Sequence, residues 1–334
     1  MKSKIIVTGA AGFIGSHTAK LLIEKNHEVI GIDNLNDYYE PQLKRDRLDH
    51  LVGSQFINHI IDISNPESLQ EIFQSFKPDY IIHLAAQAGV RYSQENPQKY
   101  LDSNIKGFLN ILEASRHQNV KKVIYASSSS VYGANLKLPY LESDKTDDPL
   151  NFYAVTKKCN ELMATAYNHM YGMSLTGLRF FTAYGPWGRP DMAITKFVDA
   201  IINKKSIDLF NEGLHKRDFT YIDDIVIRIN NLIELNLLEN TDEHGKYSIE
   251  RKESTHEIYN IGNQRPILVK ELVHSLENII GKKAIINFRE KQKVDALDTF
   301  SNSNKINNLL DTNKSISIHE GLRRYVEWHK IYYL

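Results

Sequence analysis

The chain begins with the stretch Lys4-Ile5-Ile6-Val7-Thr8-Gly9-Ala10-Ala11-Gly12-Phe13-Ile14-Gly15-Ser16-His17. A short apolar run rich in β-branched residues predicts a buried parallel strand, and a glycine-punctuated turn then leads into a helical pattern at residues 18–25. Gly9 can take a backbone conformation barred to other residues, Gly12 lets the backbone approach a phosphate, and Gly15 lets the helix pack closely on the strand. Because the first N–H groups of the helix and its dipole attract an anion, the stretch predicts a site for a dinucleotide pyrophosphate.

An acidic residue follows about 20 residues later, at the spacing expected for a dinucleotide site. The run Val29-Ile30-Gly31-Ile32-Asp33 predicts a second strand that ends in a carboxylate placed for the adenosine ribose. The same carboxylate would repel a 2′-phosphate, and no adjacent Arg is present to accept one. The sequence therefore favours NAD over NADP, and the alternative interpretation of the opening stretch is an ordinary turn between a strand and a helix.

Composition limits the classes of partner. The chain has 334 residues with 41 basic and 41 acidic side chains, so it has no net field to attract a polyanion and we expect no nucleic-acid partner. Cys159 is the single cysteine, and with no predicted signal peptide we expect a reducing, cytoplasmic location. No apolar run approaches the ~20 residues that span a bilayer, so we expect no membrane association.

Strands and amphipathic helices alternate through the first half of the chain. This pattern predicts an α/β fold with a doubly wound, Rossmann-type parallel sheet and helices on both faces. Further strands are expected at 56–63, 79–86, 120–126, 175–181 and 258–262, and helices at 68–76, 97–117, 153–172, 193–203, 269–281 and 321–329. The stretch 217–224 is expected to lead into another helix that runs to about 239. Residues 240–257 are expected to form an exposed, mobile excursion.

The break in this alternation after residue 181 predicts two domains. Residues 1–181 are expected to form the NAD-binding domain, with 219–239 and 258–263 returning to it. Residues 182–334 are expected to form mainly a second, smaller α/β lobe that closes over a ligand.

Polar and small side chains follow several predicted strands, at the edge where open α/β sheets bind ligands. Asp62 ends the third strand, where it could meet an adenine amino group or could cap the next helix. The fourth strand ends in small residues, which leave room for a ligand. The fifth strand runs into four serines, Ser127 to Ser130, which either face the crevice or form an exposed loop.

Tyr153 and Lys157 lie at positions i and i+4 of a predicted helix, so both side chains leave the same face. Alone, this spacing is more often a surface pair; together with the glycine turn and the serine strand it becomes specific. A tyrosine with an ordinary pKa near 10 is a poor base at neutral pH. We expect the Lys157 ammonium and a positive nicotinamide ring to favour the phenolate, so that Tyr153 serves as the base for a carbinol proton.

These motifs together resemble the extended short-chain dehydrogenase/reductase family. The resemblance rests on a Thr-Gly-x-x-Gly-x-x-Gly turn, a strand-end serine and Tyr-x-x-x-Lys, and it covers nearly the whole chain. Within that family the sequence is similar to the UDP-glucuronate 4-epimerases, which make UDP-galacturonate for surface polysaccharides. The stretches that carry this similarity are 33–39, 85–93, 127–133, 180–182, 185–193 and 217–224.

The resemblance implies an NAD-dependent isomerase that inverts C4 of a UDP-sugar through a 4-keto intermediate. Ser128 matches the family's catalytic Ser/Thr, and Tyr153 and Lys157 complete the catalytic set, with Lys157 also on the nicotinamide ribose. No metal is expected. The family also implies a homodimer, in which helices 97–117 and 153–172 pair with their mates. The other cofactor contacts it implies are Gly9, Gly12, Phe13, Ile14, Gly15, Asp33, Asn34, Asp62, Ile63, Leu84, Ala85, Ala86, Gln87 and Asn104.

Short hydroxyl side chains bear on the identity of the sugar. Thr182 stands where the family's UDP-galactose 4-epimerases carry Asn, and Ser129 and Ser130 are neutral where its decarboxylases and dehydratases place an acid. We expect these three residues to hold the C5 carboxylate of the 4-keto intermediate, a β-keto acid, so that carbon dioxide is not lost. The alternatives are a 4-epimerase of UDP-glucose or UDP-N-acetylglucosamine, a dehydratase or net oxidoreductase, and a non-catalytic NAD-sensing protein.

The UDP end of such a substrate requires cations. Arg189 and Arg217 are expected on the diphosphate, with a surface salt bridge as the alternative for each. Arg91 is expected near either the phosphates or the sugar carboxylate. Asp295 is expected on the nucleotide ribose, although this chain reads Gln292-Lys293-Val294-Asp295 where relatives have a Gly before the Asp.

Overall fold

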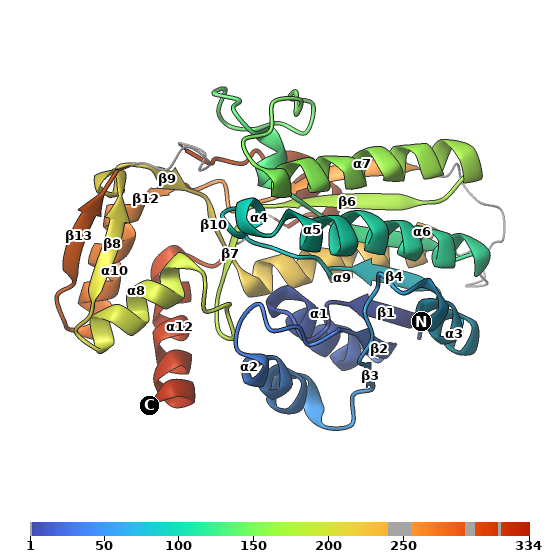
Figure 1. Cartoon of the computed structure of the whole chain (residues 1–334), viewed down its shortest axis with the longest axis horizontal. Coiled ribbons are helices and arrows are strands. Elements are labelled where there is room, and N and C mark those ends of the chain that lie inside the picture. Colours follow the sequence, from blue (N-terminus) through green and yellow to red (C-terminus); the bar gives the residue numbers. More distant parts are fainter. Residues whose placement is uncertain (1, 240–254, 291–297, 313–314) are drawn as a thin grey trace.

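A parallel sheet forms the centre of the molecule, whose computed structural model describes residues 2–239, 255–290, 298–312 and 315–334 (Figure 1). Within these residues the sheet has seven strands, and every neighbouring pair is parallel. In spatial order the strands are β11 (His256–Ile261), β6 (Leu175–Phe180), β5 (Lys122–Ser128), β4 (Tyr80–His83), β1 (Lys4–Thr8), β2 (Glu28–Ile32) and β3 (Asn58–His59). The predicted doubly wound α/β fold is confirmed.

Strand β1 buries its side chains on both faces of the sheet. Ile5 and Val7 join the apolar cluster under one pair of helices, whereas Ile6 joins the cluster under the helices of the opposite face. The first pair is α1 (Phe13–Glu24) and α9 (Ile222–Glu239), and the opposite helices are α3 (Pro66–Phe76), α6 (Gly107–His117) and α7 (Phe152–Tyr171). Burial on both faces explains why β1 is a continuous apolar run rather than an alternating one.

The edge of the sheet at β3 differs from the prediction. A strand over 56–63 was expected, but only Asn58 and His59 pair, with Gly31 and Ile32 of β2. Between β2 and β3 the chain forms α2 (Pro41–Asp46) and the π-helical turn η1 (Arg47–Gly53). Ile60, which made the expected strand appear apolar, lies just beyond this pair and is 66% exposed.

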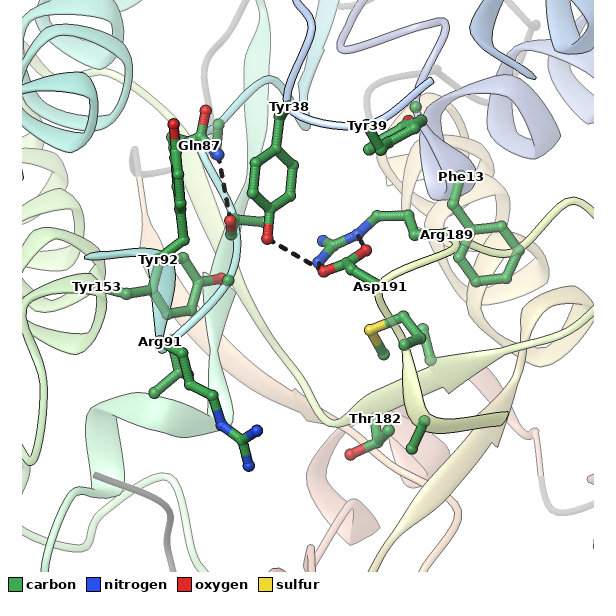
Figure 2. A pocket seen from close by; sticks show the side chains of 18 of the residues that line it. Phe13, Tyr38, Tyr39, Gln87, Arg91, Tyr92, Tyr153, Thr182, Arg189 and Asp191 are labelled. Carbon is green, nitrogen blue, oxygen red and sulfur yellow. Dashed lines mark hydrogen bonds and ion pairs between the residues drawn. The ribbon is translucent and has the colours of Figure 1, made fainter. Parts of the chain in front are cut away.

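The long helix predicted over 97–117 is helical throughout but not uniform. It consists of α5 (Pro97–Tyr100), a π-helical segment η2 (Leu101–Lys106) and then α6, and the short helix α4 (Tyr92–Glu95) precedes it. Wider π turns inside a helix are frequent at functional sites. The carboxyl ends of the strands, including the end of β4 just before this region, open onto the cavity shown in Figure 2.

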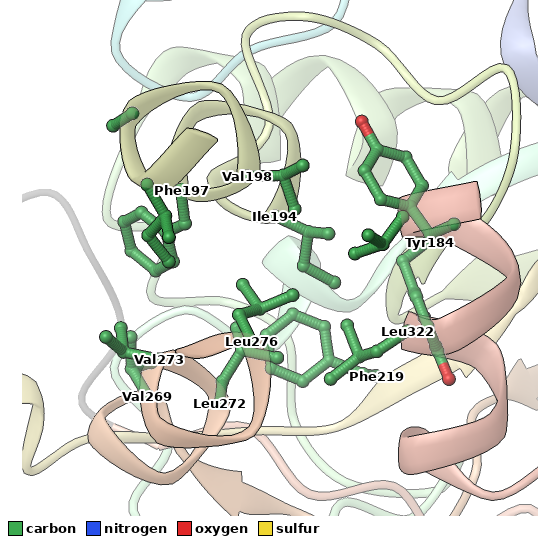
Figure 3. Close-up of a cluster of buried hydrophobic side chains, with 14 of the residues drawn as sticks. Tyr184, Ile194, Phe197, Val198, Phe219, Val269, Leu272, Val273, Leu276 and Leu322 are labelled. Atoms are coloured by element: carbon green, nitrogen blue, oxygen red, sulfur yellow. The ribbon is translucent and has the colours of Figure 1, made fainter. Parts of the chain in front are cut away.

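A second lobe lies beside the sheet and has an apolar core of its own. Phe197, Leu272 and Leu322 belong to this core, which Figure 3 shows between three helices. Its strands pair as β7 (Thr182–Tyr184) with β10 (Phe219–Tyr221), β9 (Lys216–Arg217) with β12 (Ile267–Leu268), and β8 (Ser206–Phe210) with β13 (Ile285–Arg289). Its helices are α8 (Ala193–Ile202), α10 (Val269–Ile280) and α12 (Ile318–Tyr333), and the 3₁₀ turn η4 (Asn211–Gly213) follows β8. The 3₁₀ turn η3 (Ser129–Tyr132) follows β5, and helix α11 (Asn304–Leu310) packs on β11 and α9.

Segments from the second half of the sequence return to the sheet. Helix α9 packs on α1, and β11 pairs with β6. His256 and Glu257, expected in an exposed excursion, instead begin β11, and the remainder of that excursion, 240–254, lies outside the described residues. The domain boundaries remain a prediction. No helix of the described part of the chain is long and apolar enough to cross a membrane.

Helix α7 is fixed at both ends and in its middle. The Asn151 side chain caps its first turn by accepting the Ala154 N–H at 2.9 Å, and Gly172 ends it with a φ of 63°. In the middle, Glu161 pairs with Arg179 of β6 through Nε–Oε1 and Nη2–Oε2 contacts of 2.8 and 2.9 Å. Both side chains are 3% exposed, so this ion pair locks α7 onto the sheet.

Replacing Glu161 by Leu should lower the free energy of unfolding by about 3–5 kcal/mol, because the buried guanidinium of Arg179 would lose its carboxylate. The double variant Glu161→Leu/Arg179→Met should recover most of this loss, since it removes both charges. Urea unfolding at neutral pH measures both effects. Glu71→Leu, on the exposed face of α3, is the control and should change stability by no more than about 0.5 kcal/mol. Equal stability of Glu161→Leu and the wild type would contradict this role of the pair.

Candidate active site

A cavity of about 1250 Å³ lies at the carboxyl edge of the sheet, against the second lobe. It is larger than the roughly 300–1000 Å³ typical of a site for one drug-sized ligand, so it has room for two nucleotides. Asp295 lies outside the described residues. The predicted residues that line the cavity are Gly9, Gly12, Phe13, Ile14, Gly15, Asp33, Asn34, Asp62, Ile63, Leu84, Ala85, Ala86, Gln87, Arg91, Ser128, Ser129, Ser130, Tyr153, Lys157, Thr182, Arg189 and Arg217.

The glycine turn is as tight as the sequence predicts. Gly9 has a φ of 71°, and its carbonyl accepts the Gly12 N–H at 2.9 Å. A Cβ on Gly15 would lie 2.0 Å from that same carbonyl oxygen, so only glycine fits there. Helix α1 begins at Phe13 without a side-chain cap, and its first residues line the cavity. The turn and helix end therefore fit the pyrophosphate of a dinucleotide.

Asp33 is held at the end of β2 by backbone donors. Its Oδ2 accepts the Ala11 N–H at 3.1 Å and its Oδ1 accepts the Leu35 N–H at 2.9 Å. Burial raises the pKa of Asp33, and the neighbouring Lys44 ammonium opposes that shift. Lys44 in turn donates to the carbonyl and the side-chain oxygen of Asn36, at 2.7 and 2.9 Å. The Asp33 carboxylate therefore lies where the ribose of a dinucleotide is expected. The neighbouring Lys44 ammonium is bonded to Asn36, in the loop that follows Asp33.

Asp62 takes part in a different local structure from the cap considered above. It accepts hydrogen bonds from the Asn34 amide and the Ser64 N–H, both at 2.8 Å. Helix α3 is capped by Asn65 instead, whose side chain accepts the Ser68 N–H at 3.2 Å. These bonds fix Asp62 at the cavity wall beside Asn34, so the adenine end of a dinucleotide is within its reach.

Asn104 does not line the cavity, although sequence reasoning placed it among the cofactor contacts. Its Oδ1 accepts the Gln87 N–H at 2.8 Å and its Nδ2 donates to the Gln87 carbonyl at 3.1 Å. The same Nδ2 donates to Thr156 at 3.0 Å. Asn104 therefore lies behind the wall and holds Gln87, which does line the cavity, against helix α7.

Tyr153, Lys157 and Ser128 meet at the end of β5. Ser128 accepts the Ser130 N–H at 3.1 Å, and its side chain lies close enough to Tyr153 to act on the pKa of the phenol. Lys157 is 2% exposed, and its Nζ donates to the Ala126 carbonyl at 2.9 Å. Figure 2 shows Tyr153 at the cavity wall, across the cavity from Thr182. The phenol and the hydroxyl thus face a common space.

Burial dominates the electrostatics of this group. Burial raises the pKa of Tyr153, while the Ser128 side chain and the charge of Arg189 act in the opposite direction. Burial also lowers the pKa of Lys157 to about 7. Desolvation dominates the pKa of both groups, and the Lys157 Nζ donates to the Ala126 carbonyl. The combined effect of Lys157 and a positive nicotinamide ring on Tyr153 stays a prediction.

Arg189 forms an ion pair inside the cavity rather than on the surface. Its Nε and Nη2 donate to the two carboxylate oxygens of Asp191 at 2.9 and 2.6 Å, and the Tyr38 hydroxyl donates to the same carboxylate at 3.1 Å (Figure 2). The guanidinium holds the pKa of Asp191 below its usual range against the opposing effect of burial. Tyr38 and Asp191 therefore join the loop after β2 to the loop after β7.

The other predicted cations lie at separate places around the cavity. Arg217, in β9, donates from Nη1 to the Lys216 carbonyl at 2.9 Å. The Arg91 guanidinium lies 4.5 Å from the centre of the Phe210 ring, so it reaches from the loop after β4 to strand β8 of the second lobe. These positions spread positive charge along the side of the cavity that faces the second lobe.

Sequence reasoning missed several residues of this site. Tyr38 and Asp191 belong to the stretches 33–39 and 185–193 that carry the family similarity. Their closeness in sequence to Asp33 and Arg189 could have indicated that they belong to the site. Lys44 carried no such signal, because its approach to Asp33 depends on how α2 folds back. Among the described residues no group of His, Cys, Asp or Glu side chains could hold a metal ion.

The glycine turn, the Tyr and Lys of one helix facing a strand-end serine, and the second lobe across the cavity define a dinucleotide-dependent enzyme of the extended short-chain dehydrogenase/reductase class. The NAD dependent epimerase/dehydratase family matches over residues 5–262, and the chain belongs to this family. The resemblance inferred from the sequence is therefore confirmed.

Individual relatives are similar over nearly the whole chain. Protein CapI of Staphylococcus aureus is 47% identical over 331 residues, covering 99% of each chain. UDP-glucuronate 4-epimerase 4 of Arabidopsis thaliana is 44% identical over 335 residues, covering 98% of this chain and 76% of the relative. The crystal structure of UDP-glucuronic acid 4-epimerase from Bacillus cereus in complex with UDP-glucuronic acid and NAD has a TM-score of 0.88 at 33% identity, covering 99% of this chain and 100% of that chain.

The buried Lys157 should give the stability of the protein a specific pH dependence. Its pKa falls from 10.5 to about 7 on folding, so between these values the unfolded chain binds a proton that the folded chain does not. The free energy of unfolding should therefore rise with pH in this window. Urea unfolding between pH 7 and pH 10 measures this effect on the nucleotide-free protein. The free energy of unfolding of the wild type should rise by up to about 1.4 kcal/mol per pH unit more than that of Lys157→Met.

Lys158→Met is the matched control, because Lys158 is the next residue on α7 and bonds to the Thr146 hydroxyl instead. This variant should keep the wild-type slope of stability against pH. Parallel curves for the wild type and Lys157→Met would show that the buried lysine does not lose its proton in this range.

Proposed function

We propose that this protein is an NAD-dependent isomerase that inverts C4 of UDP-glucuronate to give UDP-galacturonate. The observation that carries the proposal is the convergence of Tyr153 and Ser128 on a cavity that also reaches Thr182 and the glycine turn. The family membership and the UDP-glucuronate 4-epimerases among the relatives support the same assignment. Because the residues at both ends of the cavity suit nucleotides, dinucleotide and UDP-sugar fit side by side.

The chain's own residues would hold the dinucleotide and move the proton. The glycine turn and the end of α1 bind the pyrophosphate, Asp33 binds the adenosine ribose, and Lys157 binds the nicotinamide ribose. When bound, NAD supplies a hydride acceptor and donor for C4. Tyr153 takes the proton of the C4 hydroxyl and returns it, and Ser128 holds that oxygen. Burial raises the pKa of Tyr153, and Ser128 and Arg189 oppose that shift. A positive nicotinamide ring would favour the phenolate further when NAD is bound.

The sugar carboxylate explains the short hydroxyl side chains. Ser129 and Ser130 follow the catalytic Ser128 in a 3₁₀ turn, and Thr182 faces them from the first strand of the second lobe. Hydroxyl donors can hold the C5 carboxylate out of the conformation in which a β-keto acid loses carbon dioxide. Since residues 127–130 include no carboxylate, the loop offers no acid for an elimination.

The UDP part would lie toward the second lobe. We assign the diphosphate to Arg189 and Arg217, because a guanidinium matches phosphate oxygens with two parallel donors. In this arrangement Asp191 orients Arg189 through its Nε and Nη2 edge. Arg91, stacked on Phe210, serves the phosphates or the sugar carboxylate. Asp295 remains a prediction for the nucleotide ribose.

We also propose a homodimer that pairs the helices spanning 97–117 and 152–171. Apolar side chains on these helices are exposed, among them Leu109 at 40%, Leu162 at 57% and Met170 at 59%. Leu162 and Met170 are eight residues apart on α7 and so share a face. The protein would work in the cytoplasm, where the single Cys159 stays reduced, and its product would serve polysaccharide biosynthesis as an activated sugar acid.

The purified protein should convert UDP-glucuronate to UDP-galacturonate without added cofactor, because the hydride removed from C4 returns to it. Anion-exchange chromatography and proton NMR of the sugar nucleotides measure the conversion. Conversion of UDP-glucose or UDP-N-acetylglucosamine with no reaction of UDP-glucuronate would contradict the uronate assignment. Accumulation of reduced cofactor or of a stable keto product would contradict epimerisation.

The variant Tyr153→Phe ties this reaction to the proposed base. It should lower kcat by about 10²–10⁴-fold, the usual contribution of a general base. Tyr171→Phe, which removes a hydroxyl at the far end of the same helix, is the matched control and should keep the wild-type rate. Unchanged turnover by Tyr153→Phe would remove Tyr153 from the reaction.

Leu162→Glu should convert the dimer to a monomer, because it places a charge in the apolar face between paired helices. Sedimentation velocity at micromolar concentration measures the change. Ile331→Glu is the control, since Ile331 is 85% exposed on α12 of the second lobe, and it should sediment as the wild type. A wild type that sediments as a monomer would contradict the proposed assembly.

A further inference from the structure

The loop Gly185–Asp191 brings Arg189 and Asp191 to the cavity from the second lobe. It connects β7 to α8, and within it Trp187 has a φ of 65°. A positive φ is unfavourable for a bulky side chain, so contacts elsewhere must hold the loop in this form. The side chain of Trp187 packs on Trp328 and Tyr332 of α12, with ring centres 5.4 and 5.0 Å apart.

The backbone of this loop is held by side chains of the other lobe. Arg47 Nε and Nη2 donate to the Trp187 carbonyl at 3.0 and 2.8 Å, and Nη2 also donates to the Gly188 carbonyl at 3.4 Å. His17 Nε2, on α1, bonds to the Pro186 carbonyl at 3.0 Å. The carbonyls of consecutive loop residues are thus bonded by one arginine and one histidine from the sheet domain.

The same guanidinium reaches the glycine turn. Arg47 Nη1 donates to the Ala11 carbonyl at 3.0 Å and to the Tyr39 hydroxyl at 2.5 Å. Arg47 is fully buried, and its planar fork joins the glycine turn, the loop after β2 and the loop after β7. Neither Arg47 nor His17 lines the cavity, so neither belongs to the binding surface described above.

His17 donates to the loop as a neutral side chain. Because a carbonyl can only accept, its bond to Pro186 requires the proton on Nε2. Burial, opposed by that bond and assisted by the nearby Arg47 charge, lowers the pKa of His17 to about 4. The imidazole is therefore neutral in the neutral pH range.

We propose that Arg47 and His17 are positioning residues that fasten the loop Gly185–Asp191 to the glycine turn and its helix, and so set the affinity for the diphosphate of the substrate. This inference rests on the proposed function, in which Arg189 binds that diphosphate. Arg47 acts through the backbone of Trp187, two residues before Arg189. A substitution at Arg47 or His17 should therefore weaken nucleotide binding without touching the reacting carbon.

The test compares Arg47→Lys and His17→Phe with the wild type, all loaded with NAD. Lysine keeps the charge at position 47 but lacks the planar fork, and phenylalanine removes the donor at position 17. UDP binding by calorimetry and the kinetics with UDP-glucuronate are measured together with urea unfolding. Arg47→Lys should raise the Kd for UDP and the KM by about tenfold or more while kcat changes less than about threefold, and His17→Phe should raise both constants by a smaller factor.

Arg45→Lys is the matched control, since Arg45 is exposed on α2 two residues before Arg47, and it should keep the wild-type Kd and KM. If both variants are less stable but keep the wild-type Kd and KM, the residues are only structural and the inference is overturned. If Arg47→Lys does not fold, His17→Phe, which breaks a single hydrogen bond, decides between the same two results. A wild type that neither binds UDP nor converts UDP-glucuronate would instead overturn the proposed function on which the inference rests.

Discussion

The contact between helix α7 and the end of strand β5 determines the geometry of the whole site. Lys157 donates to the Ala126 carbonyl at 2.9 Å, and one turn further along the helix Glu161 accepts the Ser127 hydroxyl at 2.7 Å. These bonds fix the helix along β5, so Tyr153, one turn before Lys157, meets Ser128 at the strand end. Burial of the charged ammonium is unfavourable, and it lowers the pKa of Lys157. The packing of α7 on the sheet therefore has to hold Lys157 in this buried position.

Features that depend on local sequence were predictable. The glycine turn, the central strands with their buried apolar runs, the serines after β5 and the Tyr-x-x-x-Lys spacing each follow from a few adjacent residues, and the structure brings them to one cavity. Strand β3 was overestimated, because an apolar run at a sheet edge looks the same in sequence as one in the middle. The parallel, doubly wound sheet followed from the alternation of strands and helices.

Features that depend on distant contacts were not predictable from one sequence. Arg47 is 140 residues from Trp187, and nothing in its charged neighbourhood distinguishes it from exposed Arg45. The pKa values of Tyr153 and Lys157 depend on burial, which the i, i+4 spacing does not reveal. The position of Asn104 was not predictable either. Asn104 lies in the π-helical segment that interrupts the long helix, and its side chain bonds to the backbone of Gln87 instead of lining the cavity.

The two lobes contribute different parts of the proposed chemistry. The sheet domain supplies the dinucleotide site and the proton-transfer group, while the second lobe supplies Thr182, Arg189 and Arg217. The bridge from Tyr38 to Asp191 and the contacts of Arg47 join these parts across the cavity. A sugar that must turn over between two hydride transfers needs this division, since its nucleotide has to stay bound while its ring moves.

The most direct test of this account follows the hydrogen at C4. UDP-glucuronate labelled with deuterium at C4 is converted by the enzyme in ordinary water, and the product is analysed by NMR and mass spectrometry. The account predicts that UDP-galacturonate retains the deuterium at C4, because the hydride leaves that carbon and returns to it within one closed site. Loss of the label to solvent would contradict it.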